Sequence, residues 1–405
     1  MPGSLRDALH RAAAIPDRPL DLDRLVARGH RRRRRHRIGL AAGAFVLVAA
    51  VTSAVVVAAR PAPDRPPPEL ADPIRLDALP AGWTELPAPP RLRYGGATAW
   101  TGDQLLVWSG ESSEMSGPEP GGYVLDARTG AWREMAPARL AARSSPAAAW
   151  TGTELLVWGG DDQTAGHEYG DGAAYDPQRD AWRQLAPAPI SGRAPLSVWT
   201  GEELIVWGTA MRRYPAPTDG AAYRPATDSW RRIAEGPVEL TDATAVWTGT
   251  EMVVLGAALD GNNSPRTPTA IAAAYDPAAD RWRRLPDPDL SPQASTAAWN
   301  GAEVIAWDYL LRAAAYDPAR DRWRPLPDVP LDDSECVPES APVGGDVFGG
   351  YCGDVVLYES GEERWRTISR LEAGGWFALV AAGPVVVVLA EVAGRAAALA
   401  YRPPG

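Results

Sequence analysis

Short apolar runs separated by polar turns recur along the chain, and the unit they form returns about every 50 residues. In one copy, residues 147–189, an apolar run ends at Trp150 before Thr-Gly, and a second ends in Gly159-Gly160. A polar loop follows, then an Ala-Tyr-Asp-Pro sequence containing Tyr175, and then Trp182. Apolar runs of this length between turn residues predict β-strands, and four such strands per unit predict the blades of a β-propeller.

The same marks can be followed through the other copies, and we name the four strands of a blade a to d from the centre outward. Strand a is predicted to end at a tryptophan before Thr-Gly or Asn-Gly, a turn that allows positive φ. These tryptophans are Trp100, Trp150, Trp199, Trp247 and Trp299. Strand c carries Tyr175, Tyr223, Tyr275 and Tyr316. Strand d carries Trp132, Trp182, Trp230, Trp282, Trp323 and Trp365. We expect these aromatic residues to pack the blades, because they keep phase with the strands.

Residues 81–405 therefore form the predicted all-β domain. Its first stretch, around Trp83, looks like a strand d without a blade, and its last, around Tyr401, looks like a strand c without a strand d. Pairing the two ends would close the ring and remove exposed sheet edges. The strand-d tryptophans, Trp83 included, predict seven blades. A six-bladed ring is the alternative, since the unit at 341–365 is irregular.

This pattern resembles the kelch repeat over roughly residues 82–403. The resemblance rests on a glycine doublet after strand b, a tyrosine in strand c and a tryptophan in strand d, as in Gly159-Gly160, Tyr175 and Trp182. In other copies the doublet is replaced by Ser109-Gly110, Gly208-Thr209, Gly256-Ala257 and Trp307-Asp308. The resemblance implies a kelch-like propeller of the kind found in galactose oxidase. It also makes arginines near the central channel relevant, because kelch propellers that bind acidic peptides use arginines there.

The N-terminal part predicts a membrane anchor. Residues 1–37 contain 11 Arg and 4 Asp and end in the run RGHRRRRRHR. The 22 residues of 38–59 carry no charge, and a helix of that length spans roughly 33 Å, enough for a bilayer core. Arginines before this segment predict a cytoplasmic basic tail, a single-pass signal anchor in the cell membrane and an extracytoplasmic propeller after the Pro-rich linker of residues 60–80. A cleaved signal peptide is the alternative. Nucleic acid is not a predicted partner.

The residue inventory excludes several chemistries. Of the four histidines only His167 lies in the predicted propeller, so a copper oxidase of the galactose oxidase type, which needs paired imidazoles, is excluded. No phosphate-binding or dinucleotide-binding motif is present, and we expect no cofactor and no metal. The acids near His167 could bind calcium through oxygen ligands. Because surface loops are often acidic, we favour an unoccupied surface loop; its residues are Asp161, Asp162, His167, Glu168 and Asp171.

Arginines at the entrances to strand a are the predicted ligand-binding residues. Arg93, Arg143 and Arg193 hold this place in the first three blades, on the rim where d–a and b–c loops meet. Guanidinium groups there suit a carboxylate of an acidic peptide, protein or glycan. The long loops of residues 208–221 and 256–270 lie on the same rim, and the first adds Arg212, Arg213 and Tyr214 to the predicted site. The alternative is that each arginine pairs with an acid of a neighbouring loop.

The two cysteines, Cys336 and Cys352, lie in the irregular sixth unit. Outside the cytoplasm a disulfide between them is predicted, with two buried thiols as the alternative. For the whole chain the leading prediction is a membrane-anchored recognition module. An enzyme acting on acidic sugars, similar to sialic-acid mutarotases and using Arg143 or Arg193 with Glu168, is the first alternative. A purely structural surface module is the second.

Overall fold

The computed structural model describes residues 74–404 except 113–116, 209–215, 259–266, 268, 293–294, 332–337, 352, 372 and 393–394. The predicted basic tail, transmembrane segment and most of the Pro-rich linker lie outside this range. No helix in the described part is long and apolar enough to cross a bilayer. Its regular structure consists of strands and two short 3-10 helices, η1 (Leu76–Ala78) and η2 (Pro225–Thr227).

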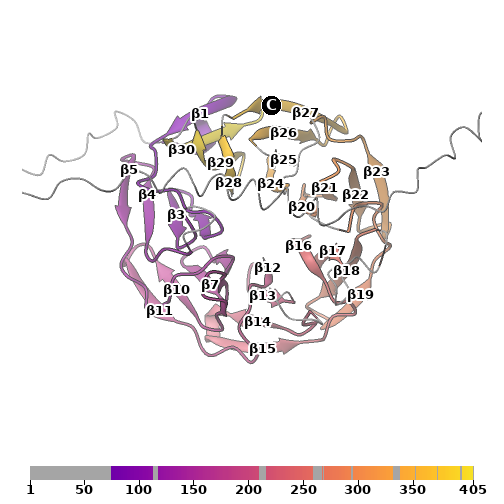
Figure 1. Ribbon diagram of the computed structural model, residues 1–405, viewed down its shortest axis with the longest axis horizontal. Coiled ribbons are helices and arrows are strands. Elements are labelled where there is room, and N and C mark those ends of the chain that lie inside the picture. The colour runs from indigo at the N-terminus through magenta and orange to yellow at the C-terminus, as the bar shows by residue number, and fades with distance from the viewer. Residues whose placement is uncertain are drawn as a thin grey trace, which may run out of the picture. The chain divides into compact units, whose positions relative to one another are not determined.

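The described strands form seven four-stranded antiparallel sheets arranged around a common axis (Figure 1). The all-β, seven-bladed prediction is therefore confirmed over the six-bladed alternative. Blade 1 contains β2 (Ala97–Trp100), β3 (Gln104–Trp108), β4 (Gly122–Asp126) and β5 (Ala131–Glu134). Blade 2 contains β6 (Ala147–Trp150), β7 (Leu155–Trp158), β10 (Gly172–Asp176) and β11 (Ala181–Gln184). Blade 3 contains β12 (Leu196–Trp199), β13 (Leu204–Trp207), β14 (Gly220–Arg224) and β15 (Ser229–Ile233).

The remaining blades follow the same strand order. Blade 4 contains β16 (Thr241–Trp247), β17 (Met252–Ala257), β18 (Ile271–Asp276) and β19 (Arg281–Arg284). Blade 5 contains β20 (Ser295–Trp299), β21 (Val304–Asp308), β22 (Ala313–Asp317) and β23 (Arg322–Leu326). Blade 6 contains β24 (Glu339–Val343), β25 (Asp346–Tyr351), β26 (Asp354–Glu359) and β27 (Arg364–Arg370). Blade 7 contains β28 (Ala373–Ala382), β29 (Val385–Val392), β30 (Arg395–Arg402) and β1 (Gly82–Leu86).

The two ends of the propeller meet in blade 7. The first strand, β1, pairs antiparallel with the last, β30, with Trp83 opposite Tyr401. Trp83 donates a hydrogen bond to Ser369 of blade 6 at 3.1 Å. The first strand thus supplies the outermost strand of the last blade, and the ring closes without a covalent link.

Each pair of neighbouring blades shares a hydrophobic core. Strand b is buried on both faces because it is sandwiched between two blades, and in β7 all four residues are buried. The largest strand-b side chains are fully buried tryptophans: Trp108, Trp158, Trp207 and Trp307. One core cluster, for example, combines Leu156 and Trp158 of blade 2 with Val206 and Tyr223 of blade 3. Since all these cores lie between blades, blade-to-blade contacts stabilise the fold.

The glycine doublet of blade 2 fits a close approach between chain segments. Gly159 and Gly160 both have positive φ, 68° and 92°. A Cβ atom on Gly159 would lie 2.6 Å from the carbonyl oxygen of Arg193, and one on Gly160 would lie 2.6 Å from that of Ser144. Both carbonyls belong to the segments that enter strand a. The doublet thus lets the b–c loop pack directly against these entrances.

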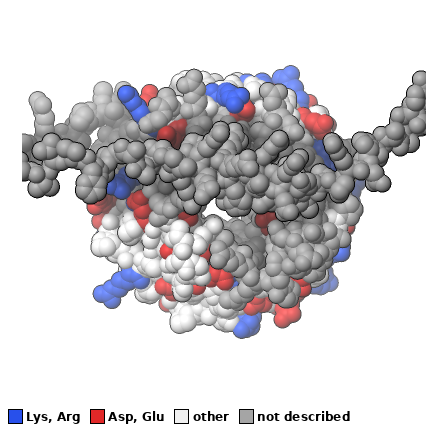
Figure 2. All heavy atoms as spheres, viewed as in Figure 1, with Lys and Arg blue, Asp and Glu red and all other residues white. Residues whose placement is uncertain are grey.

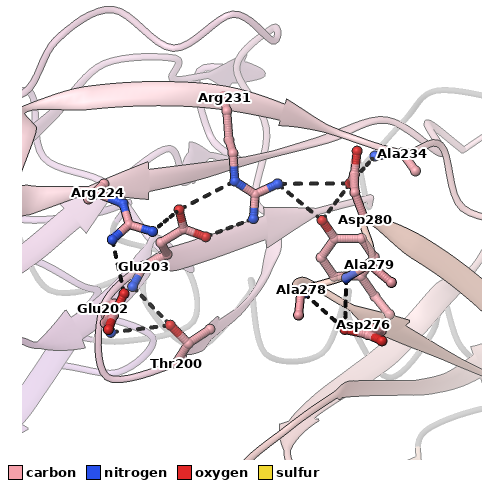
Figure 3. A network of polar contacts seen from close by, with 11 residues as sticks. Thr200, Glu202, Glu203, Arg224, Arg231, Ala234, Asp276, Ala278, Ala279 and Asp280 are labelled. Atoms are coloured by element: carbon pink, nitrogen blue, oxygen red, sulfur yellow. Dashed lines mark hydrogen bonds and ion pairs between the residues drawn. The ribbon is translucent and has the colours of Figure 1, made fainter.

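A recurring polar contact, which we call the clamp, joins the outer parts of neighbouring blades. Between blades 3 and 4, Arg231 donates from Nε and Nη2 to the two carboxylate oxygens of Glu203 at 3.3 and 2.7 Å (Figure 3). Its Nη1 donates to the hydroxyl of Tyr275 in the next blade at 3.2 Å. That hydroxyl donates to Asp280 at 2.7 Å, and Asp280 also accepts from the backbone of Ala234 at 2.9 Å. The clamp therefore fixes both blades together.

The bidentate arginine–glutamate pair of the clamp is present in four consecutive blades. In each, the arginine follows the strand-d tryptophan and the glutamate precedes strand b. The pairs are Arg183 with Glu154, Arg231 with Glu203, Arg283 with Glu251, and Arg324 with Glu303. The strand-d tryptophan adds a second link: Trp230, for example, donates to the carbonyl of Ala186 in the preceding blade at 2.9 Å.

Candidate functional site

The antiparallel strands give the propeller two rims. We call the rim of the b–c and d–a loops the loop rim, and the rim of the a–b and c–d turns the turn rim. The predicted ligand-binding arginines belong to the loop rim. The clamps belong to the turn rim, because their glutamates lie at the start of strand b and their tyrosines near the end of strand c.

Arg143 is fully buried on the loop rim, with 0% of its side chain exposed. Its Nη1 donates to the Asp171 carboxylate at 2.9 Å and to the Gly159 carbonyl at 3.1 Å. Its Nε donates to the Ala141 carbonyl at 2.9 Å. The guanidinium lies 4.2 Å from the ring centre of Tyr169, a cation–π contact. Arg143 therefore ties the b–c loop of blade 2 to the entrance of strand a.

The equivalent arginines of blades 1 and 3 make related pairs. Arg193 is 1% exposed and donates to Asp219 at 2.7 Å. Arg93 is 4% exposed and forms an ion pair with Glu119 at 2.6 Å. The hydroxyl of Ser112 and the charge of Arg93 hold the pKa of Glu119 below its ordinary value. The structure thus places the three guanidiniums on corresponding parts of three blades, each against an acid of its own b–c loop.

Ligand binding by these arginines stays a prediction, and their contacts show which groups a ligand would have to displace. A ligand carboxylate would compete with Asp171, Asp219 or Glu119 for groups that are already bound and buried. The other predicted binding residues, Arg212, Arg213 and Tyr214, lie outside the described residues. So do Cys336 and Cys352 with their predicted disulfide.

The acidic loop of blade 2 forms a small hairpin that was not predicted, β8 (Asp161–Asp162) with β9 (His167–Glu168). Asp161 pairs with Glu168 on one side and bridges Ser144 on the other, so their side chains share one face. The Ser144 hydroxyl donates to Glu111 of blade 1 at 2.8 Å. Asp161 is 2% exposed, and neither of its carboxylate oxygens has a hydrogen-bond partner among the described residues. Burial, followed by the charges of Glu111, Glu168 and Asp162, raises the pKa of Asp161 to about 6.

Two further observations concern chemistry near the channel. Within the described ranges, no three His, Cys, Asp or Glu side chains converge in a way that could hold a metal ion. Glu339 is the first residue of β24, the innermost strand of blade 6. Burial raises the pKa of Glu339 to about 7. A carboxyl group in that range can exchange a proton near neutral pH.

A cleft of about 610 Å³ opens on the turn rim between blades 1 and 2. Blade 1 contributes Gln104 and Arg133, and blade 2 contributes the ring of Trp150. The other lining residues are Thr101, Asp103, Arg128, Gly152, Thr153, Pro177, Gln178 and Asp180. The walls are thus mostly polar, with one large aromatic side chain, so a ligand held here would be bound chiefly through polar contacts.

The cleft coincides with a break in the series of clamps. Arg133 is the blade 1 counterpart of Arg231, and it contacts Tyr175 at 3.2 Å and Asp180 at 2.8 Å. The position of the clamp glutamate is taken by Gln104, whose Oε1 is buried without a partner in the described structure. Sequence analysis missed this site. The signal was present, since aligning the repeats places Gln104 where the next four blades have a glutamate.

Charged side chains on the outer surface are largely compensated. Figure 2 shows arginines and acids near one another along the outer edge of the propeller. Ion pairs within a blade are common in the described structure, such as Arg179 with Asp176 at 2.6 Å and Arg364 with Glu359 at 2.8 Å. Exposed pairs of this kind contribute little to stability. The outer edge therefore offers no single-sign patch for a ligand in this view.

Comparisons with known proteins assign this chain to no family. No protein-family model matches the sequence, and a search of curated proteins finds no relative. Among solved structures, one titled "Structure of YjhT" matches with a TM-score of 0.49 and 16% sequence identity. The match covers 77% of this chain and 95% of that one. A likeness at this level assigns neither a family nor an activity.

Proposed function

We propose that the protein is a membrane-anchored recognition module whose kelch-type propeller binds a peptide, protein or glycan outside the cytoplasm. The single observation that carries this proposal is the polar cleft between blades 1 and 2. It is a preformed concave site with one aromatic wall on a rigid scaffold. The repeated Trp and Tyr residues and the tightly packed Gly159-Gly160 doublet support the kelch assignment.

The location in the membrane is supported by the sequence. Residues 38–59 are uncharged and follow an arginine run, which favours an anchor with the N-terminus in the cytoplasm. Its test is protease treatment of intact cells. Propeller epitopes should be cleaved while the tail is protected, and deleting residues 38–59 should release the protein from the membrane fraction. Protection of the propeller in intact cells would overturn the orientation.

The recognition role is tested by a broad ligand screen with the full-length chain in detergent micelles. Acidic and neutral glycans and peptides would be measured by calorimetry, beside variants of each rim. Trp150→Ala removes the aromatic wall of the cleft, and a combined Arg93, Arg143 and Arg193 to alanine variant addresses the predicted loop-rim site. Loss of binding in one variant, with its melting temperature retained, would assign the rim. Absence of any ligand in the screen would contradict the recognition role.

An enzyme acting on acidic sugars is the second candidate, and Glu339 is the observation that favours it. Its raised pKa suits a general acid or base. The arginines predicted to act with the glutamate, Arg143 and Arg193, are less available. Their guanidiniums are held by Asp171 and Asp219. The test is to follow exchange of sialic acid anomers by NMR. Faster exchange with the wild-type protein than with Glu339→Gln would support catalysis, and equal rates would exclude a role for this residue.

A further inference from the structure

The clamps provide an internal comparison for the cleft. In blades 2 to 5, the arginine after the strand-d tryptophan binds both oxygens of a glutamate, with Nε and Nη2 as donors. The guanidinium edge formed by these two nitrogens matches the geometry of a carboxylate. The same scaffold therefore shows four times which chemical group this arginine position accepts.

In blade 1 that edge of the arginine has no carboxylate. Arg133 contacts Tyr175, Asp180 and two backbone carbonyls through Nη1 and Nη2. Its Nε makes no hydrogen bond to the described residues. The side chain is 39% exposed and lines the cleft. A polar donor facing a solvent-accessible cleft is available to a ligand.

The replacement of glutamate by glutamine changes both charge and hydrogen bonding. Glutamate would be an acceptor carrying a negative charge, and it would repel an anion. Gln104 is neutral, and its amide carries two N–H donors. Relative to the complete clamps, the junction of blades 1 and 2 lacks one negative charge and gains donors. Both changes favour an anionic group at this position.

We propose that the cleft between blades 1 and 2 binds an organic carboxylate, which takes the place of the missing clamp glutamate against Arg133 and Gln104. The body of the ligand lies in the cleft beside Trp150, with Thr153 and Gln178 among the polar residues that line it. A sugar acid and an acidic peptide side chain share this carboxylate chemistry. The inference rests on the proposed recognition function and names the ligand class for its site.

The test uses the full-length chain in detergent micelles and two matched pairs of probes. The first pair is glucuronate and glucose, and the second is acetylated, amidated glutamate and its glutamine counterpart. We expect at least one acid to bind by calorimetry and its neutral counterpart to bind at least tenfold more weakly. Which acid binds distinguishes a sugar from a peptide source.

Two substitutions of the same kind localise the binding. Gln104→Glu supplies the missing glutamate and should weaken the acid at least tenfold while preserving the fold. Gln184→Glu makes the same chemical change on the exposed outer strand of blade 2 and should leave affinity unchanged. Arg133→Lys keeps the charge but loses the flat guanidinium edge, and it should also weaken binding.

The outcomes separate this inference from the function on which it rests. Equal affinity of wild type and Gln104→Glu for the acid would overturn the carboxylate site. The carboxylate site would also be overturned if no acid bound and a neutral ligand bound in a way that Trp150→Ala abolishes. The recognition role would then stand. If the broad screen finds no ligand at all, both the recognition role and the carboxylate site are overturned.

Discussion

The junction between blades 3 and 4 and the junction between blades 1 and 2 have the same backbone plan and different chemistry. At the first, Arg231 binds Glu203 through two hydrogen bonds and reaches Tyr275 in the next blade. At the second, Arg133 reaches Tyr175 and Asp180 in the next blade, and Gln104 occupies the position of the clamp glutamate. At the position of the clamp glutamate, the two junctions differ by one carboxylate oxygen exchanged for an amide nitrogen.

This difference shows how a repeat protein can acquire a site without a new element. In the complete clamp of blade 3, two arginines compensate the charge of the glutamate. With glutamine in its place, the arginine keeps its links to the next blade but loses its partner within the blade. The cores still hold the blades together, and Arg133 and Gln104 both line a cleft.

The largest predicted effect comes from breaking a complete clamp. Glu203 is only 10% exposed. Burial would raise its pKa, but the hydrogen bonds and charges of Arg231 and Arg224 outweigh this and hold the pKa below its ordinary value. Arg231→Ala leaves Glu203 buried with less compensation, and we expect unfolding free energy to fall by about 3 kcal/mol.

Chemical denaturation of the two variants Arg231→Ala and Arg232→Ala measures this prediction. Arg232 lies next to Arg231 on the same strand but is 63% exposed, so its removal should change the free energy by less than about 1 kcal/mol. Equal effects of the two substitutions would show that the clamp contributes no more than an ordinary surface arginine.

The architecture could be predicted from sequence because every blade places the same requirements on its strands and turns. Strand b must be apolar on both faces, and the turn after Trp150 needs a residue that tolerates positive φ, here Gly152 at 99°. Repetition made these marks visible even where the glycine doublet is lost. The hairpin of Asp161 and Glu168 was not predictable from apolar periodicity, since its residues are polar and its pairing depends on the neighbouring loop.

The site was harder to predict because arginine gives the same sequence signal in two roles. The rim positions of Arg143 and Arg193 predict ligand binding, and the structure places each of the two against an acid of its own blade. Arg133 looked like one more member of a repeated Trp-Arg pair. Arg133 differs from the other members because Gln104 occupies the position of the clamp glutamate. That these two positions, on strands d and b, belong to one contact becomes visible only in the folded blade.

The second predicted effect contrasts the clamp glutamates, which are held by arginines, with Asp161, whose carboxylate has no hydrogen-bond partner among the described residues. Its pKa is raised to about 6, so the folded state takes up a proton more readily than the unfolded chain, where an aspartate has a pKa of about 3.9. Stability therefore falls as pH rises from about 4 to about 6, and the loss is complete above that. Asp161→Asn removes the charge and should increase stability at pH 7.5 by on the order of 2 kcal/mol.

Thermal unfolding from pH 4 to pH 8 measures this effect, which should shrink toward pH 4. Asp162→Asn is the matched control on the adjacent residue. Asp162 accepts hydrogen bonds from Thr164 and Ala165 at 2.6 and 2.9 Å, which lower its pKa. Its substitution should therefore reduce stability at pH 7.5. A pH-independent change in Asp161→Asn would mean that folding does not raise the pKa of this carboxyl.

The smallest predicted effect is the one that would make the two junctions alike. Gln104→Glu should complete a fifth clamp with Arg133 and increase unfolding free energy by about 1 kcal/mol at neutral pH. The new carboxyl, like that of Glu203, should have a pKa below its ordinary value. The gain should therefore be present above the unfolded pKa of about 4.3 and be lost as pH falls through the lower folded value. Denaturation of wild type and variant at pH 7 and pH 3 measures it. A variant no more stable than wild type at pH 7 would mean that the junction of blades 1 and 2 differs from the others in geometry as well as in the residue at position 104.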